Sequence, residues 1–391
     1  MRLTERKSRR LPISKRIATS VREHAARSHM FKAVLGLLRT RIVPSFLVNR
    51  AVANGLIREE LESALKLVRN WEELPQVLAG IAEDLYEKGR YWDELGLKSR
   101  ACDHYLDSSL WGFYAQLLLT DSAEQRWAVY AKCAHSYRMA APHFHHPAQQ
   151  ISIALQSGSL KGYLRLPGRQ AGQAVRPSPC VIILNNLASS KEELHFTENA
   201  FLKMGLATLS LDLPGCGESL DTSLQSANIE VLGNAVYLFL ASHPAVDQES
   251  LALHGISLGG SLALYLAIKF PGRFKAIATL SAPYDLAANP ILFLPAFRRE
   301  LACLTRGREE VIREYARKTA VRGWLDEISC PILVAGGGKD IVIPPPDTRI
   351  IYQKSGVSDK KLLYCPQAGH CCYEMMPSLR YEIAQWIRQR I

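Results

Sequence analysis

The serine at position 257 has the local sequence of a nucleophile that is presented on a sharp turn. It is the centre of a glycine-x-serine-x-glycine pentapeptide, Gly255 to Gly259, between the apolar run 251–254 and a helix expected over 261–270. A tight strand-to-helix turn leaves no room for side chains two residues before and after the serine, so glycine suits both places. The pattern predicts an activated serine, and the alternative is a serine in an ordinary tight turn.

A serine nucleophile needs a base, and the base needs a carboxylate that orients it. Where the serine follows such a turn, the chain order is serine, then acid, then histidine. Asp340 lies in the loop just after the apolar run 331–337, and His370 lies in the loop after the next run, preceded by Gly369, which would let that loop bend. We predict a catalytic triad of Ser257, Asp340 and His370. A degenerate, inactive copy of the same site is the alternative.

Two backbone N–H groups should hold the negative charge that develops on the substrate oxygen during attack. Leu258, the residue after the nucleophile, supplies the first. The second comes from the loop 185–193, which follows the apolar run 180–185 and points to Leu187. Donors fixed in this way are commonly worth ~3 kcal/mol each in the transition state. We therefore predict an oxyanion hole made by Leu187 and Leu258.

Three residues are candidates for contact with the substrate: Asn186, Trp111 and Tyr114. Asn186 adjoins the predicted oxyanion donor, whereas the two aromatic residues belong to a helical segment in front of the sheet, where core packing is the competing interpretation. The segment 286–327 lies between two expected strands and is long enough to form an extra lid. Asp212 follows a strand in a turn rich in proline and glycine, and we expect it to brace neighbouring loops.

These residues must be positioned by a sheet, because short apolar runs alternate with helical stretches in the second part of the chain. The hairpin expected over 151–167 turns at Gly158. The apolar runs that follow it are 180–185, 206–212, 251–255, 276–281, 331–337 and 361–366. Such alternation predicts an α/β fold with a mostly parallel sheet that carries helices on both faces. The leading hairpin would add antiparallel strands at one edge.

The chain divides into three predicted parts. Residues 51–145 have apolar residues at three- and four-residue spacing and no strand signal, which predicts an all-helical lid or cap module. Residues 146–391 form the predicted catalytic domain. Residues 1–50 form a basic arm with 13 Lys and Arg against two Glu, whereas residues 51–391 hold 35 basic and 35 acidic residues. The formal net charge of +11 therefore belongs to the arm.

The basic arm has no apolar run long enough to span a membrane, and no recognised nucleic-acid-binding module follows it. We therefore expect no nucleic-acid partner. Three interpretations of the arm stay open: a solvated extension, an Arg-rich transit peptide, and an arm of residues 1–50 that contacts an anionic surface.

The histidines and cysteines do not have the spacing of a metal site. His143, His145 and His146 crowd a junction bounded by prolines, but no cysteine or carboxylate stands at a ligand-like spacing nearby. The nine cysteines include no C-x-x-C pair, which is typical of reduced thiols in a cytoplasm. We predict a cytoplasmic protein with no metal and no cofactor. The oligomeric state is open and includes a homodimer.

Four motifs together resemble the α/β-hydrolase superfamily over residues 151–391. They are Gly-Ile-Ser-Leu-Gly-Gly at 255–260, Gly-Gly-Gly-Lys-Asp at 336–340, Ala-Gly-His at 368–370 and Asp-Leu-Pro-Gly-Cys-Gly-Glu-Ser at 212–219. A helical module in front of the hydrolase domain, combined with Leu-Ala-Ser-Ser-Lys-Glu-Glu at 187–193, is similar to one branch of that superfamily. The branch contains 2,6-dihydroxypseudooxynicotine hydrolase, polyketide-shortening fungal hydrolases and the fermentation/respiration switch protein.

This resemblance implies cleavage of a carbon–carbon bond next to a ketone, with the helical module closing over the active site. One departure is Asn185-Asn186, where the family usually has His-Gly or Gly-Gly, and it leaves the substrate class open. We predict a serine hydrolase acting on a small carbonyl substrate such as a β-diketone or polyketide-like chain. An ester or thioester hydrolase, or an acyltransferase, would use the same triad. A non-catalytic binding protein on this fold is the alternative from another class.

Overall fold

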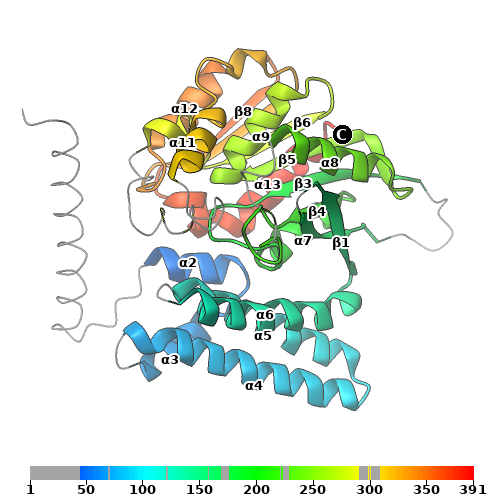
Figure 1. The fold of residues 1–391 in the computed structure, drawn as a ribbon, viewed down its shortest axis with the longest axis vertical. Coiled ribbons are helices and arrows are strands. Elements are labelled where there is room, and N and C mark those ends of the chain that lie inside the picture. Colours follow the sequence, from blue (N-terminus) through cyan, green and yellow to red (C-terminus); the bar gives the residue numbers. More distant parts are fainter. Residues whose placement is uncertain are drawn as a thin grey trace, which may run out of the picture.

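The computed structural model describes most of the chain beyond residue 44. The described residues are 45–68, 71–119, 122–156, 158–168, 176–220, 222, 229–289, 298, 300 and 309–391. They form an α/β domain with a layer of helices packed beneath it (Figure 1). Most of the predicted basic arm lies outside the described residues, so its contact with an anionic surface stays a prediction.

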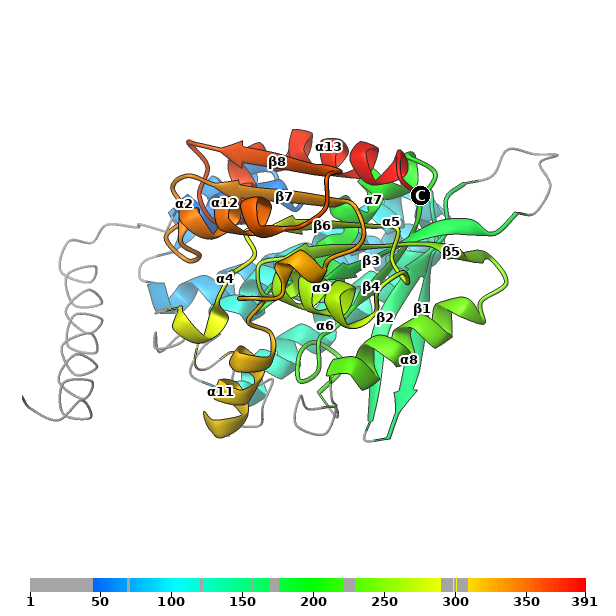
Figure 2. The same cartoon turned by 90° about the horizontal axis from the view of Figure 1, so that it is seen from above.

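One eight-stranded sheet runs through the α/β domain in the order β1-β2-β4-β3-β5-β6-β7-β8. The strands are β1 (Ala148–Leu155), β2 (Gly158–Arg165), β3 (Ser178–Leu184), β4 (Ala207–Leu211), β5 (Val246–Ile256), β6 (Ala276–Leu280), β7 (Ile332–Gly337) and β8 (Lys360–Cys365). The strands β1, β2 and β4 pair antiparallel, and all other neighbours are parallel. The predicted sheet and its leading hairpin are confirmed. Figure 2 shows the sheet running from β1 and β2 at one edge to β8 at the other.

The central strands are buried on both faces because helices cover each side. In β3, Ile182 packs in the core under α8 (Ile229–Ala241), α9 (Leu258–Lys269) and α12 (Pro345–Lys354). The next residue, Ile183, packs in the opposite core under α7 (His195–Lys203) and α13 (Met376–Arg388). Adjacent strand residues point to opposite faces, so a strand covered on both sides is apolar at every position. This explains why the strands are continuous apolar runs in the sequence.

The segment in front of the sheet is helical, as predicted. It contains α2 (Ser45–Ala53), α3 (Arg58–Leu67), η1 (Trp71–Glu73), α4 (Leu74–Glu94), α5 (Lys98–Leu118), α6 (Ala123–Ala140) and η2 (Ala141–His143). Ser122 caps α6 by accepting a hydrogen bond from the Gln125 N–H. The predicted boundary at residue 50 falls inside α2, which lies between α5 and the α/β domain (Figure 1). None of the helices in the described part of the chain is long and apolar enough to cross a membrane.

The predicted extra lid is only partly described. It includes η4 (Leu286–Ala288), α11 (Glu309–Lys318) and η6 (Leu325–Glu327), whereas residues 290–297, 299 and 301–308 lie outside the described residues. Glu300 accepts two hydrogen bonds from Arg126 of α6, at 2.6 and 2.9 Å. A direct ion pair therefore joins this segment to the helical module. Its role as a lid stays a prediction.

Candidate active site

Ser257 occupies a strained turn between β5 and α9. Its backbone angles are φ 52° and ψ −114°, a region that residues with a side chain rarely adopt. A Cβ on Gly255 would lie 2.3 Å from the Gly259 carbonyl oxygen, and a Cβ on Gly259 would lie 2.0 Å from the Leu184 carbonyl oxygen. Glycine is required at both positions because the backbone of the turn and of β3 fills that space.

In the predicted triad, His370 lies within hydrogen-bonding distance of both Ser257 and Asp340. The His370 Nε2 atom is 3.0 Å from the Ser257 Oγ, and the His370 Nδ1 atom is 2.8 Å from an Asp340 carboxylate oxygen. All three side chains are buried. Ser257 and His370 are 113 residues apart in the chain, and Asp340 and His370 are 30 residues apart. They meet because the loops that carry them all leave the carboxyl edge of the sheet.

The Asp340 carboxylate is held by its own loop as well as by the histidine. Its Oδ1 atom accepts hydrogen bonds from the Val342 and Ile343 N–H groups, at 2.9 and 2.8 Å. These bonds leave Oδ2 aimed at the imidazole, so the carboxylate can select the tautomer that has its proton on Nδ1. The unprotonated Nε2 then faces the serine hydroxyl, which is the arrangement that a general base requires.

The surroundings of His370 stabilise the imidazolium that forms when the imidazole takes up a proton. Burial disfavours the charge, but the neighbouring Cys371 sulfur and the Asp340 carboxylate outweigh it and raise the pKa of His370 above its usual value. A base with a raised pKa accepts a proton from a serine hydroxyl more readily than an ordinary imidazole does.

The bend in the histidine loop is not made by Gly369, as the sequence had suggested. Gly369 has a negative φ of −84°, whereas Cys371 and Cys372 have positive φ values of 57° and 48°. The Cys371 N–H donates to the Ser281 Oγ at 3.0 Å, which helps to hold this unusual backbone. The glycine that lets the end of β7 lie close to the histidine loop is Gly337. A Cβ there would lie 2.3 Å from the Ala368 carbonyl oxygen and 2.2 Å from that of Gly369.

The two predicted oxyanion donors follow two segments that pack against each other, the serine turn and the end of β3. Leu258 is the first residue of α9, so its N–H has no partner within the helix. Leu187 lies in the loop that follows β3, next to Ala188, which has a positive φ of 58°. The Gly259 contact with Leu184 shows that this loop begins directly against the serine turn. The assignment of both N–H groups stays a prediction.

The asparagine pair at the start of this loop has two different environments. Asn186 donates a hydrogen bond to the Tyr373 hydroxyl at 3.1 Å, which ties the loop to the segment that carries His370. Asn185 is buried, and neither its Oδ1 nor its Nδ2 has a partner among the described residues. Contact between Asn186 and a substrate stays a prediction.

The two aromatic candidates, Trp111 and Tyr114, are buried in the core of the helical module. The Tyr114 hydroxyl donates toward the Arg50 carbonyl oxygen and a Glu193 carboxylate oxygen, at 3.0 and 3.1 Å, and accepts from the Asn54 amide. Burial in this core makes both residues part of the packing in this structure. Their contact with a substrate stays a prediction.

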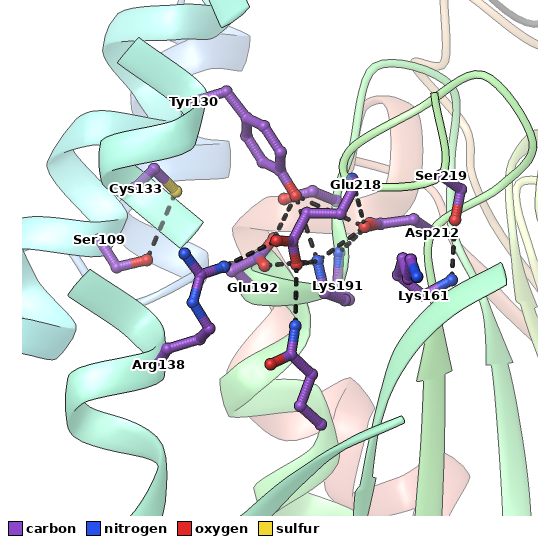
Figure 3. Close-up of polar contacts among 12 residues, drawn as sticks. Ser109, Tyr130, Cys133, Arg138, Lys161, Lys191, Glu192, Asp212, Glu218 and Ser219 are labelled. Atoms are coloured by element: carbon purple, nitrogen blue, oxygen red, sulfur yellow. Dashed lines mark hydrogen bonds and ion pairs between the residues drawn. The ribbon is translucent and has the colours of Figure 1, made fainter. Parts of the chain in front are cut away.

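A buried ionic cluster braces the end of the loop 185–193, as Figure 3 shows. The Lys191 ammonium lies 2.7 Å from Asp212, 2.7 Å from Glu192 and 2.9 Å from Glu218, and it donates to the Tyr130 hydroxyl of α6 at 3.2 Å. Burial opposes the charge on Lys191, but Asp212 and Glu192 outweigh it and raise its pKa. Lys191 therefore stays charged among these carboxylates, between the helical module and the sheet.

Asp212 joins two loops, which agrees with the bracing role expected from its position. One carboxylate oxygen accepts from the Lys191 N–H and the other from the Glu218 N–H, both at 2.9 Å. Both carboxylate oxygens of Asp212 are thus used in contacts that connect these loops.

Sequence reasoning missed two residues of this site, Arg50 and Glu193. Arg50 is the last residue of the predicted basic arm, and Glu193 ends the motif at 187–193 without an assigned role in the site. Both are buried and paired with each other. The apolar helical pattern of residues 45–53 was the signal that could have moved Arg50 out of the arm.

No group of three or more His, Cys, Asp or Glu side chains within the described residues is arranged to hold a metal ion.

Comparisons with known proteins agree with this geometry. A model of the family described as "Esterase FrsA-like" matches residues 99–390. The 2,6-dihydropseudooxynicotine hydrolase of Paenarthrobacter nicotinovorans is 28% identical over 295 residues, which cover 75% of this chain and 78% of that protein. The Esterase FrsA of Enterobacter sp. (strain 638) is 27% identical over 293 residues, which cover 71% of this chain and 67% of that protein.

A solved structure extends the similarity to the helical module. The crystal structure of the 2,6-dihydroxy-pseudo-oxynicotine hydrolase superposes with a TM-score of 0.75 and 25% identity, over 88% of this chain and 95% of that chain. The match is longer than the sheet domain alone, so the helices in front of the sheet belong to the shared architecture. The chain belongs to the FrsA-like esterase family, whose members are hydrolases with the α/β-hydrolase fold.

Proposed function

We propose that this chain is a serine hydrolase in which Ser257 attacks the substrate carbonyl. The observation that carries the proposal is the hydrogen-bonded series from Ser257 through His370 to Asp340, at 3.0 and 2.8 Å. The strained backbone of Ser257 adds support, because a nucleophile on such a turn stands clear of the sheet edge. An ordinary buried serine would have no need of either feature.

The reaction follows from these positions. The Ser257 Oγ forms a bond to the carbonyl carbon while its proton moves to His370 Nε2, and Asp340 stabilises the resulting imidazolium. The Leu187 and Leu258 N–H groups hold the oxyanion. The intermediate collapses when the bond to the leaving group breaks, and His370 returns the proton to that group. Water then hydrolyses the acyl-enzyme by the same sequence, with His370 as base.

For the leaving group, we propose a carbanion next to a ketone, so that the bond cleaved is carbon–carbon. In a β-diketone the electrons of that bond are stabilised as an enolate, which takes the proton from His370. Support comes from the similarity to 2,6-dihydropseudooxynicotine hydrolase, which includes the helical module as well as the sheet domain.

The second candidate is an ester hydrolase that uses the same residues. It is favoured by the family's description as esterases and by the 27% identity to Esterase FrsA. The first steps are identical in the two reactions, because a nucleophilic serine attacks a ketone and an ester in the same way. Only the leaving group distinguishes them.

A substrate panel separates the two candidates. We would compare turnover of β-diketones, p-nitrophenyl esters and acyl thioesters by the wild type and by Ser257→Ala. Carbon–carbon cleavage by the wild type that is lost in Ser257→Ala is the expected result. Turnover of esters alone would refute the carbon–carbon assignment, and turnover that survives in Ser257→Ala would refute the nucleophile.

A further inference from the structure

Arg50 of α2 contacts the loop that contains Leu187 from outside the α/β domain. Its Nε and Nη2 atoms each donate to one carboxylate oxygen of Glu193, both at 2.6 Å, and Nη2 also donates to the Ala188 carbonyl oxygen at 3.0 Å. Both charged side chains are buried. A two-point pair of this kind fixes direction as well as distance, which a single ammonium cannot do.

The residues on both sides of Leu187 are held by hydrogen bonds. Ala188 has a positive φ of 58° although it carries a side chain, so its conformation needs support from its surroundings. Its neighbour Ser189 donates to Glu193 at 2.6 Å, and Asn186 is tied to Tyr373 at 3.1 Å. The backbone at Leu187 therefore lies between anchored residues, and the anchor on its carboxyl side is the Arg50–Glu193 pair.

The helix α2 also contacts the segment that carries the histidine. The ring of Phe46 in α2 lies 5.9 Å from the ring of Tyr373, three residues after His370. The same helix thus touches both the loop of the predicted oxyanion hole and the segment of the base. Two further helices contact the same loop: α5 through the Tyr114 hydroxyl on Glu193, and α6 through Tyr130 on Lys191.

We propose that Arg50 is a positioning residue that holds the Leu187 N–H in the oxyanion hole. This inference rests on the proposed function, in which that N–H stabilises the transition state. It follows that the oxyanion hole is complete only when α2 is docked on the α/β domain. The helical module then has a part in building the site as well as in covering it.

Arg380 of α13 provides a matched control. It is buried like Arg50 and also binds the N-terminal helical part, by donating to the Ala53 carbonyl oxygen at 2.7 Å and to the Asn54 side-chain oxygen. It donates to Thr197 of α7 at 3.0 Å as well. It makes no hydrogen bond to the loop residue Ala188 in the described structure. Arg380 reaches the loop through Asn54, which donates to Glu193 at 2.7 Å. Replacement of Arg380 should therefore cost stability at the end of α2 while the direct contacts of Arg50 to Ala188 and Glu193 remain.

The experiment compares Arg50→Met and Arg50→Lys with Arg380→Met and Arg380→Lys. We would measure the rate at which a small alkyl fluorophosphonate labels Ser257, together with kcat and KM for a p-nitrophenyl ester and the melting temperature. The phosphoryl oxygen of the adduct needs the same donors as the oxyanion. We expect Arg50→Met to lower the labelling rate and kcat by ~10²-fold with KM within about threefold, since a donor displaced by 1 Å costs that much.

Arg50→Lys should lie between wild type and Arg50→Met, because an ammonium keeps the charge but loses the two-point geometry. The Arg380 variants should lose melting temperature but label within about threefold of wild type. Equal labelling by Arg50 and Arg380 variants of similar melting temperature would overturn the inference. If Arg50→Met does not fold, the two lysine variants decide the question in the same way. Absence of any Ser257 adduct on the folded wild type would instead refute the proposed function, and this inference with it.

Discussion

The serine turn makes a sharp prediction for Gly259→Ala. A Cβ at this position would lie 2.0 Å from the Leu184 carbonyl oxygen and 2.6 Å from that of Asn185. Both atoms belong to backbone at the end of β3, so no flexible side chain can move aside. The methyl group must push apart the start of α9 and the start of the loop that contains Leu187.

The size of the effect follows from the overlap. An ordinary contact at a Cβ is at least 3.4 Å, so the present 2.0 Å requires a separation of about 1.4 Å. Overpacking of this kind costs roughly 1–3 kcal/mol of unfolding free energy. A displacement of about 1 Å between a nucleophile and its oxyanion donors lowers the rate by roughly 10²-fold. We therefore expect Gly259→Ala to lose both stability and kcat.

The assay is ester turnover together with urea unfolding, and Gly80→Ala is the control. Gly80 lies on the exposed side of α4, where nothing is within 4 Å of an added Cβ, so the same methyl group meets no obstacle there. If Gly259→Ala unfolded at the wild-type urea concentration and kept kcat within threefold of wild type, the packing argument for the serine turn would be wrong.

Three further predictions concern the control, the base and the buried lysine. Gly80→Ala should raise the free energy of unfolding by ~0.5–1 kcal/mol, because alanine favours a helix over glycine; urea unfolding that shows no gain would contradict this. Since only neutral His370 accepts the serine proton and its pKa is raised, kcat/KM should increase with pH through a midpoint above ~6.5. A profile already flat at pH 6.5 would exclude His370 as the base, and Asp340→Asn should move the midpoint to lower pH. Lys191→Met should cost about 3–5 kcal/mol in urea unfolding, because it leaves buried carboxylates without a cation, whereas a loss under about 1 kcal/mol would show that the cluster readily adapts.

Local pattern was enough to predict the sheet and the candidate triad. Each strand is a short apolar run, and the serine, acid and histidine each follow one of these runs within a few residues. The carboxyl ends of parallel strands meet at one edge, so the order of motifs along the chain already implied that Ser257, Asp340 and His370 would come together. Their proximity in the structure agrees with that prediction.

The bend of the histidine loop shows where local pattern stops being a guide. Glycine is the usual residue at positive φ, so Gly369 was the natural candidate. The structure places the positive φ values at Cys371 and Cys372, where burial and a hydrogen bond from the Cys371 N–H to the Ser281 Oγ support them. Such support comes from a segment 90 residues away, so it cannot be inferred from the residues next to Cys371 in the sequence.

The environment of charged side chains was the property that the sequence alone predicted least well, because the same residue type can be solvated or buried with a partner. The sequence by itself determined the fold class, the helical module and the order of the three candidate catalytic residues, all of which depend on periodicity and neighbours along the chain. Only the tertiary structure decided that Arg50 leaves the basic arm to pair with Glu193, 143 residues away, and that Lys191 is enclosed by carboxylates. The physical reason is that burying a charge is favourable only with a partner at the right distance, and that distance exists only after the helices have docked on the sheet.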